Sequence, residues 1–167
     1  MELNEKGYLD AGLHMSSMQE LKEVFVKQFT TSQTREEIYN NFLEWKTELE
    51  KKYRIYEIWV DGSFATNKIN PNDIDIVVFA YLENNQELFH QWNSIRNKDK
   101  IDAYLTIAVC EENKKILTPK LFYEMVNQRN YWRGQFGFDR NDLPKGIIVL
   151  NSNQENLITQ GGDTLCQ

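Results

Sequence analysis

Two aspartates, Asp73 and Asp75, stand one residue apart at the start of an apolar run, residues 73–80, that has the length of a buried strand. Side chains at positions i and i+2 of a strand point to the same face, so these two carboxylates project together. Carboxylates held this close raise each other's pKa unless a cation lies between them. Mg²⁺ prefers oxygen ligands, usually one or two carboxylates together with substrate phosphates. The pair therefore predicts a magnesium site.

The simpler interpretation of this pair is a turn before the strand, in which Asn72 and Asp73 cap backbone amides after Pro71. Such a turn does not account for the second acid, Asp75, inside the strand. It also leaves the Gly-Ser step upstream without a role. We therefore favour metal binding over the turn.

The next apolar run, residues 101–109, brings a third acid, Asp102. Its residues divide by alternation into a polar face and an apolar face: Asp102, Tyr104 and Thr106 on the first, Ala103, Leu105, Ile107 and Val109 on the second. If this strand lies beside the Asp75 strand, at the ~4.8 Å spacing of paired strands, Asp102 faces the pair. Three converging acids would hold two metal ions for in-line phosphoryl chemistry. Asp99, in the charged segment "RNKDK", is expected to be solvated.

A Gly-Ser step, Gly62 and Ser63, follows the strand-like segment 55–60. Glycine allows a phosphate to approach the backbone closely, and serine offers both an N–H and a hydroxyl. A helix that begins within residues 63–67 would add its positive end to the same place. Lys68, in the loop before the acid pair, either contacts a triphosphate or is solvated. These residues predict a phosphate-binding loop.

The elements that must position these residues alternate along the chain. Helices are expected from the capping box Ser17-x-x-Glu20 to near Thr30, from a cap at Thr34 through residue 49, over residues 87–95, and from the cap Thr118 to residue 132. Strands are expected at 55–60, 73–80, 101–109 and 146–150, whereas residues 1–15 show no clear period. This alternation predicts an α/β (α+β) fold, with helices packed on a mixed sheet and helices at the N-terminus.

Composition limits the class of protein. The chain has 167 residues, of which 41% are hydrophobic and 13% aromatic, and its net charge is −6. This excludes a wholly disordered chain, and the charge argues against an extended grip on DNA. No apolar stretch approaches the ~20 residues that span a bilayer, so we expect no membrane partner. We expect one domain over residues 1–150, with its core at 55–109, and a flexible polar tail over 151–167.

Neither an export signal nor a disulfide framework is visible. The N-terminus lacks a basic start followed by an apolar stretch, and the two cysteines are Cys110, after an apolar run, and Cys166, in the tail. A reducing cytoplasm is the expected location. The oligomeric state does not follow from the sequence.

The strand, the step Gly62-Ser63, the loop, Asp73-Ile74-Asp75 and a later strand with Asp102 together resemble the DNA polymerase beta-type nucleotidyltransferase superfamily. Its pattern is a hydrophobic residue, Gly, Gly or Ser, a spacer, Asp-x-Asp or Asp-x-Glu, and a third acid on a following strand. The resemblance covers residues 55–109, the size of the short stand-alone prokaryotic members. The segments "GLHMSS" and "YWRGQFGFDRNDLPKGIIVL" are similar to an uncharacterised prokaryotic group of short nucleotidyltransferase-like proteins.

The resemblance implies a role for each matched residue. Asp73 and Asp75 would bind two Mg²⁺ ions, which Mn²⁺ could replace, and Asp102 would share one ion and activate the attacking hydroxyl. Gly62 and Ser63 would hold the β- and γ-phosphates. The implied enzyme transfers a nucleoside monophosphate from an NTP, such as ATP, to a hydroxyl of a protein or RNA, as short members in toxin-antitoxin and defence systems do.

One residue departs from the superfamily pattern. Asp61 stands directly before Gly62, where the superfamily usually has a hydrophobic residue, and an acid there repels a triphosphate unless it points away. This departure keeps open an alternative: a module on the same fold that binds a nucleotide or a protein without catalysis.

Four residues near the C-terminus could also contact a substrate. Arg133 and Lys145 could bind phosphate, but surface charge is the default expectation for both. Trp132 and Phe136 are expected to be core residues rather than stacking platforms for a base.

Overall fold

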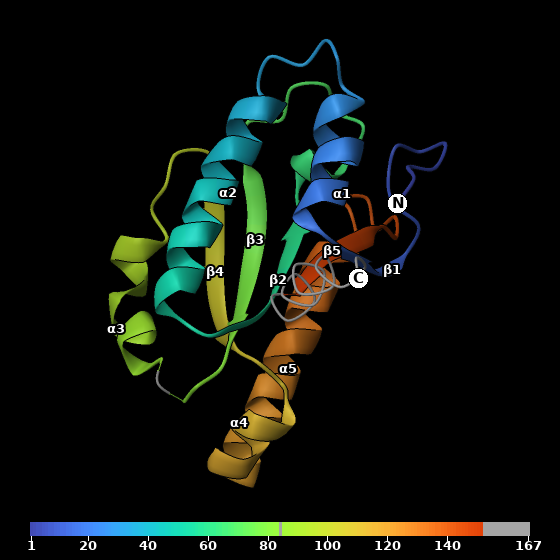
Figure 1. The fold of residues 1–167 in the computed structure, drawn as a ribbon. Helices are drawn as coiled ribbons and strands as arrows, with labels where there is room; N and C mark the ends of the chain where they lie inside the picture. The colour runs from blue at the N-terminus through green and yellow to red at the C-terminus, as the bar shows by residue number, and fades with distance from the viewer. Residues whose placement is uncertain (84, 152–167) are drawn as a thin grey trace, which may run out of the picture.

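The computed structural model describes residues 1–83 and 85–151, which form an α+β fold as the alternation predicted (Figure 1). Its five strands form one mixed sheet in the order β1-β5-β2-β3-β4. The pairs β1·β5 and β3·β4 are parallel, and the pairs β2·β3 and β2·β5 are antiparallel. The strands are β1 (Gly12–Ser16), β2 (Ile55–Asp61), β3 (Ile74–Ala80), β4 (Ile101–Ile107) and β5 (Gly146–Asn151).

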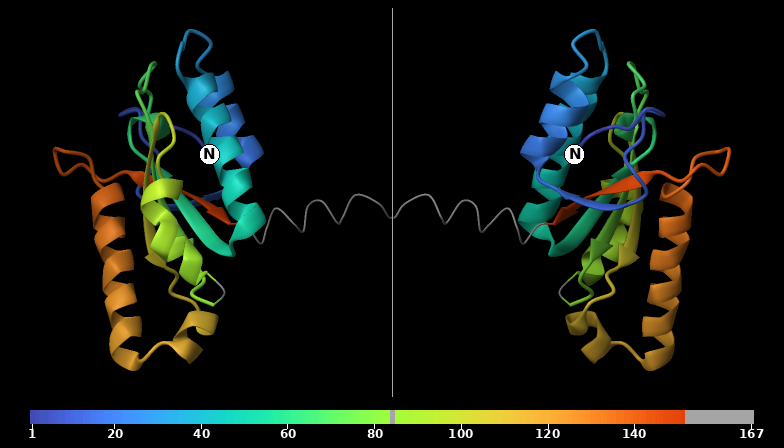
Figure 2. Two further views of the ribbon diagram at one scale, coloured as in Figure 1. Left: turned by 90° about the vertical axis from the view of Figure 1, so that its left-hand side faces the viewer. Right: turned by 90° about the vertical axis from the view of Figure 1, so that its right-hand side faces the viewer.

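Helices cover both faces of this sheet (Figure 2). On one face lie α1 and α2, with α3 beside α2, where Trp92 of α3 packs edge-on against Trp45 of α2. On the other face lies α5, preceded by the short α4. The helices are α1 (Met18–Lys22), which continues into the π-helical turn η1 (Glu23–Lys27), α2 (Arg35–Lys52), the 3₁₀ turn η2 (Ser63–Ala65), α3 (Gln86–Ile95), α4 (Glu111–Ile116) and α5 (Pro119–Phe136).

The strand side chains alternate between two apolar clusters, as expected for a sheet covered on both faces. Ile58, Val60 and Ile76 belong to the larger cluster, beneath α1, α2 and α3. The smaller cluster lies beneath α5 and contains Trp59, Val77, Phe79, Ile147 and Val149 together with Phe136 of α5. Each fully buried side chain of this size contributes about 1.5–3 kcal/mol. Residues 61 and 75 continue the alternation on the α5 side, which decides where the aspartates point.

A buried charge attaches α5 to the sheet. Glu57 of β2 is 5% exposed and accepts hydrogen bonds from the Arg129 guanidinium and from Nε1 of Trp59. The guanidinium also lies 4.6 Å from the Trp59 ring and 5.1 Å from the Phe79 ring. Most other side chains of α5 are at least partly exposed. This ion pair therefore stabilises the position of a helix that has little buried apolar surface.

No pattern in residues 1–15 predicted strand β1. Residues 12–16 are half-exposed and lack an alternating pattern, because β1 is an edge strand that pairs only with β5. Its formation depends on a partner more than 130 residues later in the chain, and no local signal reports such a partner.

Helix capping followed the expectations in two of three cases. Ser17 accepts from the Glu20 amide at 3.1 Å, and Thr118 accepts from the Leu121 amide at 3.4 Å. Thr34 occupies the cap position of α2, but its hydroxyl donates to the Pro71 carbonyl instead. Ser32 Oγ accepts from the Thr34 and Arg35 amides. The expectation that Thr34 caps α2 was therefore wrong.

Element ends differ from the expected ones by a few residues. Asp73 precedes β3, β4 ends at Ile107, α5 continues to Phe136, and β5 includes Asn151, which pairs with Glu57. The flexible tail was expected over 151–167, but Asn151 belongs to β5, and residues 152–167 lie outside the described residues. Within the part of the chain that the structure describes, no helix has both the length and the apolar character needed to cross a bilayer.

Candidate active site

Three aspartates form one row across the sheet. Asp75 of β3 pairs with Asp61 in the antiparallel ladder to β2 and with Asp102 in the parallel ladder to β4. Side chains in register on adjacent strands point to the same face, here the face that carries α5. The expectation that Asp102 lies on the strand beside Asp75 is confirmed, whereas the membership of Asp61 in this row was not foreseen.

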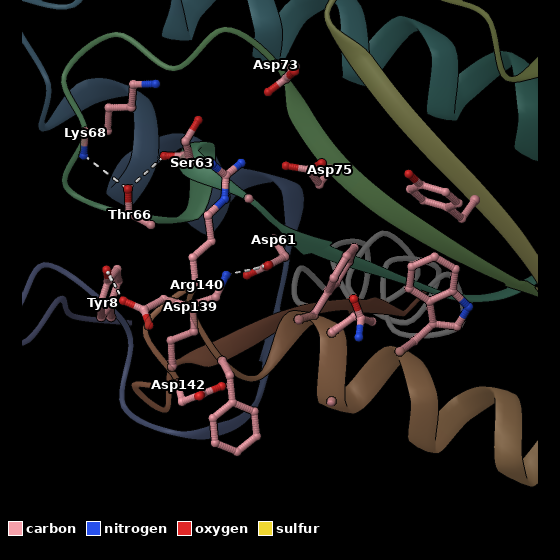
Figure 3. A pocket seen from close by; sticks show the side chains of 18 of the residues that line it. Tyr8, Asp61, Ser63, Thr66, Lys68, Asp73, Asp75, Asp139, Arg140 and Asp142 are labelled. Atoms are coloured by element: carbon pink, nitrogen blue, oxygen red, sulfur yellow. Dashed lines mark hydrogen bonds and ion pairs between the residues drawn. The ribbon is translucent and has the colours of Figure 1, made fainter.

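The row opens into a large pocket of about 990 Å³ (Figure 3). Five of the six predicted site residues line it, and they come from the loop after β2 and from the start of β3: Gly62, Ser63, Lys68, Asp73 and Asp75. The sixth, Asp102, does not line the pocket. A cavity of this volume lies at the upper end of the range for small-molecule sites.

Gly62 brings the loop against the carboxylate of Asp75. Its backbone has φ +74°, a conformation that favours glycine. A Cβ at this position would lie 1.7 Å from Oδ2 of Asp75. Only glycine therefore allows the turn and the carboxylate to occupy adjacent positions, and this places Ser63, the first residue of η2, at the pocket wall.

A buried arginine supports this loop from behind. Arg35, at the start of α2, is fully buried, and its guanidinium donates to the carbonyls of Phe64 at 2.7 Å, Thr66 at 2.7 Å and Lys68 at 2.6 Å. It also donates to the carbonyl of Phe25 at 2.8 Å. Burial lowers the pKa of Arg35 to about 10, so it remains charged at neutral pH. The guanidinium also lies over the Phe29 ring, 3.8 Å from its centroid. Because carbonyl dipoles and an aromatic face balance its charge, the loop and the arginine stabilise each other.

Negative charge accumulates at Asp75. Its pKa is raised to about 6, first by burial and then by the charges of Asp73, Asp61 and Asp102, while Lys145 opposes the shift. A carboxylate whose pKa is raised in this way gains from a cation that neutralises its neighbours. Asp73 is exposed, so the two predicted ligands combine one half-buried and one accessible carboxylate.

Asp61 is held by a lysine that was expected at the surface. Lys145 donates to Oδ2 of Asp61 at 2.5 Å, and the two side chains are only 10% and 6% exposed. Burial raises the pKa of Asp61, and Lys145 partly offsets this. The default expectation of a surface charge for Lys145 was therefore wrong, because β5 lies beside β2 and brings this residue to the end of β2. Arg133 is exposed as expected.

Asp102 does not itself line the pocket, and two side chains hold it. Its Oδ2 accepts from the Tyr104 hydroxyl at 3.0 Å, and its Oδ1 lies 3.4 Å from the Arg96 guanidinium. Among residues 1–83 and 85–151, no three His, Cys, Asp or Glu side chains converge closely enough to hold a metal ion by themselves. Asp73 and Asp75 do fit the common Mg²⁺ arrangement of two carboxylates completed by substrate phosphates and water. A role for Asp102 in catalysis stays a prediction.

Aromatic residues form another wall of the pocket. Phe136 is buried, as expected for a core residue, whereas Trp132 is half-buried and lines the pocket. The Trp132 ring lies 4.6 Å from that of Tyr104 and 5.6 Å from that of Phe136. The pocket therefore combines a polar side, formed by the loop and the aspartates, with an aromatic side.

The sequence analysis did not single out Tyr8, nor Asp139 and Arg140 of a second pocket loop, residues 137–145. Asp139 in this loop accepts from the Asn141 amide at 2.8 Å, the Leu143 amide at 2.9 Å and the Tyr8 hydroxyl at 3.0 Å. The amide of Leu143 is the main cause of the lowered pKa of Asp139. Arg140 extends from the loop into the pocket (Figure 3). The segment "YWRGQFGFDRNDLPKGIIVL" contains Asp139 and Arg140, but its resemblance assigned them no role, because only the folded chain brings them to the pocket.

A family model, described as a family of unknown function (DUF6932), matches residues 1–151. The chain belongs to this family. The match to DUF6932 includes all five strands, both pocket loops and the six predicted site residues. No curated protein and no solved structure matches the chain significantly. Membership of DUF6932 therefore assigns no activity, and the pocket has to be interpreted from its chemistry.

Proposed function

We propose that this protein is a Mg²⁺-dependent nucleotidyltransferase of the DNA polymerase beta type. It transfers a nucleoside monophosphate from an NTP to a hydroxyl of a protein or RNA acceptor and releases pyrophosphate. The observation that carries the proposal is the position of Gly62 and Ser63 against Asp75, with Asp73 nearby, on the wall of one pocket of about 990 Å³. A phosphate-binding turn and a pair of Mg²⁺ ligands are thereby adjacent.

The side chains divide the work as follows. Asp73 and Asp75 hold Mg²⁺ together with phosphate oxygens, and Mn²⁺ suits the same ligands. When bound, the ion neutralises the triphosphate and supports an in-line displacement. Gly62 admits the phosphates close to the backbone, and Ser63 donates its N–H and hydroxyl to them. Lys68, on the same loop, adds a positive charge at the pocket wall.

Asp102 takes the proton of the acceptor hydroxyl. Its place beside Asp75, one strand further across the sheet, supports this role. Its hydrogen bond from Tyr104, which lines the pocket, gives it a defined orientation toward that side. Asp102 would have to turn away from Arg96 to share a second metal ion with Asp75.

Labelling tests the activity directly. The protein is incubated with each of the four labelled NTPs, with Mg²⁺ or Mn²⁺, and with a cell lysate that supplies acceptors. We expect label on a protein or RNA species, no label with Asp73→Ala, and full label with Asp99→Ala, a matched acid that is exposed outside the pocket. Asp102→Asn should abolish labelling yet retain NTP binding. Equal labelling by wild type and Asp73→Ala, or no labelling with any NTP, contradicts the proposal.

The engagement of Asp102 favours a second candidate function: a module that binds a nucleotide or a protein without turnover. Calorimetry with a non-hydrolysable NTP separates the two when it is combined with the labelling result. Mg²⁺-dependent binding that Asp75→Asn abolishes supports the metal site in either case. Such binding together with an absence of labelling identifies the module.

We further propose a cytoplasmic location and, from the superfamily resemblance, a setting in a toxin-antitoxin or defence system. In the cytoplasm the half-buried thiol of Cys110 remains reduced. Cell fractionation and identification of the labelled acceptor test the two points separately. An acceptor with no role in growth arrest or defence would rule out the second.

A further inference from the structure

The charges around the pocket leave one arginine available to a ligand. Lys145 is paired with the buried Asp61, and Asp139 is saturated by two amides and the Tyr8 hydroxyl. Arg140 makes no hydrogen bond or ion pair with any residue of the described ranges 1–83 and 85–151. The ionisable Asp, Lys and Arg side chains that line the pocket are Asp61, Asp73, Asp75, Asp139, Asp142, Lys68, Arg140 and Lys145.

The loop that carries Arg140 has a defined backbone. The loop 137–145 is closed by a hydrogen bond from the Lys145 amide to the Gly137 carbonyl at 2.9 Å and by one from the Asp139 amide to the Leu143 carbonyl at 2.9 Å. From this loop the guanidinium of Arg140 extends toward Ser63 and Asp75 (Figure 3). A cation without a protein partner therefore reaches the space between the turn at Gly62 and the aspartate row.

We propose that Arg140 binds the phosphate chain of the nucleotide, from the loop that faces Gly62 and Ser63. This inference rests on the proposed function and adds a specificity-determining residue to it. A guanidinium donates two parallel hydrogen bonds to phosphate oxygens, and such charge-assisted pairs are stronger than neutral ones. Mg²⁺ at Asp73 and Asp75 and the guanidinium of Arg140 would then balance the triphosphate charge from two directions.

Tyr8 is the positioning residue for Arg140. The N-terminal segment contacts the first pocket loop, where the Asn67 amide donates to the Gly7 carbonyl at 2.9 Å and Tyr8 forms a β-bridge with Thr66. The hydroxyl of the same Tyr8 donates to Asp139 in the second loop. Tyr8 therefore connects the loop that carries Ser63 to the loop that carries Arg140.

Calorimetry with two probes tests the inference: a non-hydrolysable NTP with Mg²⁺, and inorganic tripolyphosphate with Mg²⁺. Arg140→Ala should weaken both ligands about tenfold or more, the usual effect of a hydrogen bond to a charged group, and Arg140→Lys should lie between it and wild type. Arg133→Ala is the matched control, because Arg133 is exposed on α5 outside the pocket. Thermal unfolding of each variant should match wild type, since Arg140 makes no contact that stabilises the fold.

A double variant tests the positioning role. Tyr8→Phe should weaken NTP binding less than Arg140→Ala does, and it should add nothing when combined with Arg140→Ala, because its effect passes through Arg140. A merely structural role would weaken the double variant further. In the labelling assay, Arg140→Ala should raise KM for the NTP much more than it lowers kcat, as expected for a residue that binds the phosphates throughout the reaction.

The outcomes separate this inference from the proposed function. NTP binding by wild type that is unchanged in Arg140→Ala overturns the inference and leaves the proposed function standing. Tripolyphosphate binding that depends on Arg140, without NTP binding or labelling, supports the inference and contradicts the proposed function. If neither probe binds wild type, both are overturned.

Discussion

Asp61 and Asp75 lie opposite each other in the ladder between β2 and β3, and Lys145 holds the first of them at 2.5 Å. The residue that departs from the nucleotidyltransferase pattern therefore has its own counter-ion. An acid next to Gly62 would otherwise add its charge to the site that we propose for a triphosphate. Lys145 therefore balances the negative charge that Asp61 adds beside Gly62.

Removing the lysine should destabilise the protein. Lys145→Met leaves Asp61 buried without its counter-ion, which typically costs about 3–5 kcal/mol. Urea unfolding at pH 7.5 measures this loss. The double variant Asp61→Asn/Lys145→Met should recover most of the stability, because no buried charge remains. Lys68→Met, an exposed lysine of the same pocket, is the control and should unfold like wild type. A double variant as unstable as Lys145→Met would show that the ion pair is not the cause.

Asp75 should make stability depend on pH. Its pKa in the folded state, about 6, exceeds the ordinary value of 3.8, so the folded state binds more protons than the unfolded state between these two values. Stability therefore falls as pH rises through this window. Asp75→Asn should be more stable than wild type above pH 6, by about 1 kcal/mol after allowance for partial solvent screening.

The measurement is thermal unfolding without divalent cations across pH 4 to 8. A gain of about 1 kcal/mol corresponds to a rise in Tm of about 2–4 °C for a chain of this size. The gain should shrink steadily toward pH 4, where Asp75 is protonated in the folded state and, with its ordinary pKa of 3.8, partly protonated in the unfolded state. Asp99→Asn, at an exposed acid outside the pocket, is the matched control. A constant gain at every pH would exclude the charge of Asp75 as its origin.

Gly62 should tolerate no side chain. Gly62→Ala places a Cβ at φ +74°, which costs about 1–2 kcal/mol, and displaces the Asp75 carboxylate. We expect lower stability together with loss of Mg²⁺-dependent NTP binding, measured by unfolding and calorimetry. In an Asp75→Ala background, Gly62→Ala should cost only the free energy of placing alanine at the positive φ of residue 62. Gly134→Ala is the control for stability alone, because Gly134 lies in α5 with no atom within 4 Å of an added Cβ and alanine favours helix, although it lines the same pocket.

Arg35 should be required for the ordered structure of the loop after β2, residues 62–68. Arg35→Met removes the donors for the carbonyls of Phe64, Thr66 and Lys68, and each buried acceptor left unpaired costs about 1–3 kcal/mol. Hydrogen exchange should show faster exchange over residues 62–68, and urea unfolding should show a lower midpoint. Arg54→Met, a cation that lies over the Tyr81 ring away from this loop, is the control. Unchanged exchange in the loop would contradict the role of Arg35.

Local patterns predicted much of the fold. Four of the five strands, the caps at Ser17 and Thr118, and helices close to α2, α3 and α5 all followed from hydrophobic period and cap residues, which act over a few positions. The edge strand β1 and the cap of α2 did not, because each depends on a partner distant in the chain: β5 for the first, and Pro71, which takes the Thr34 hydroxyl, for the second.

The candidate site divides in the same way. By itself, the sequence determined the chemistry of the motif: Gly62 and Ser63 in one loop, Asp73 and Asp75 at one strand, and Asp102 on another, because spacing within a strand fixes which face a side chain takes.

Only the tertiary structure decided the surroundings of that motif. Asp61 pairs with Lys145, and Arg35 donates to carbonyls of the loop 62–68. The Tyr8 hydroxyl donates to Asp139, which lies 131 positions later in the sequence. Such contacts form where strands β5 and β2 pair and where loops meet, so their free energy comes from long-range packing that no local pattern records.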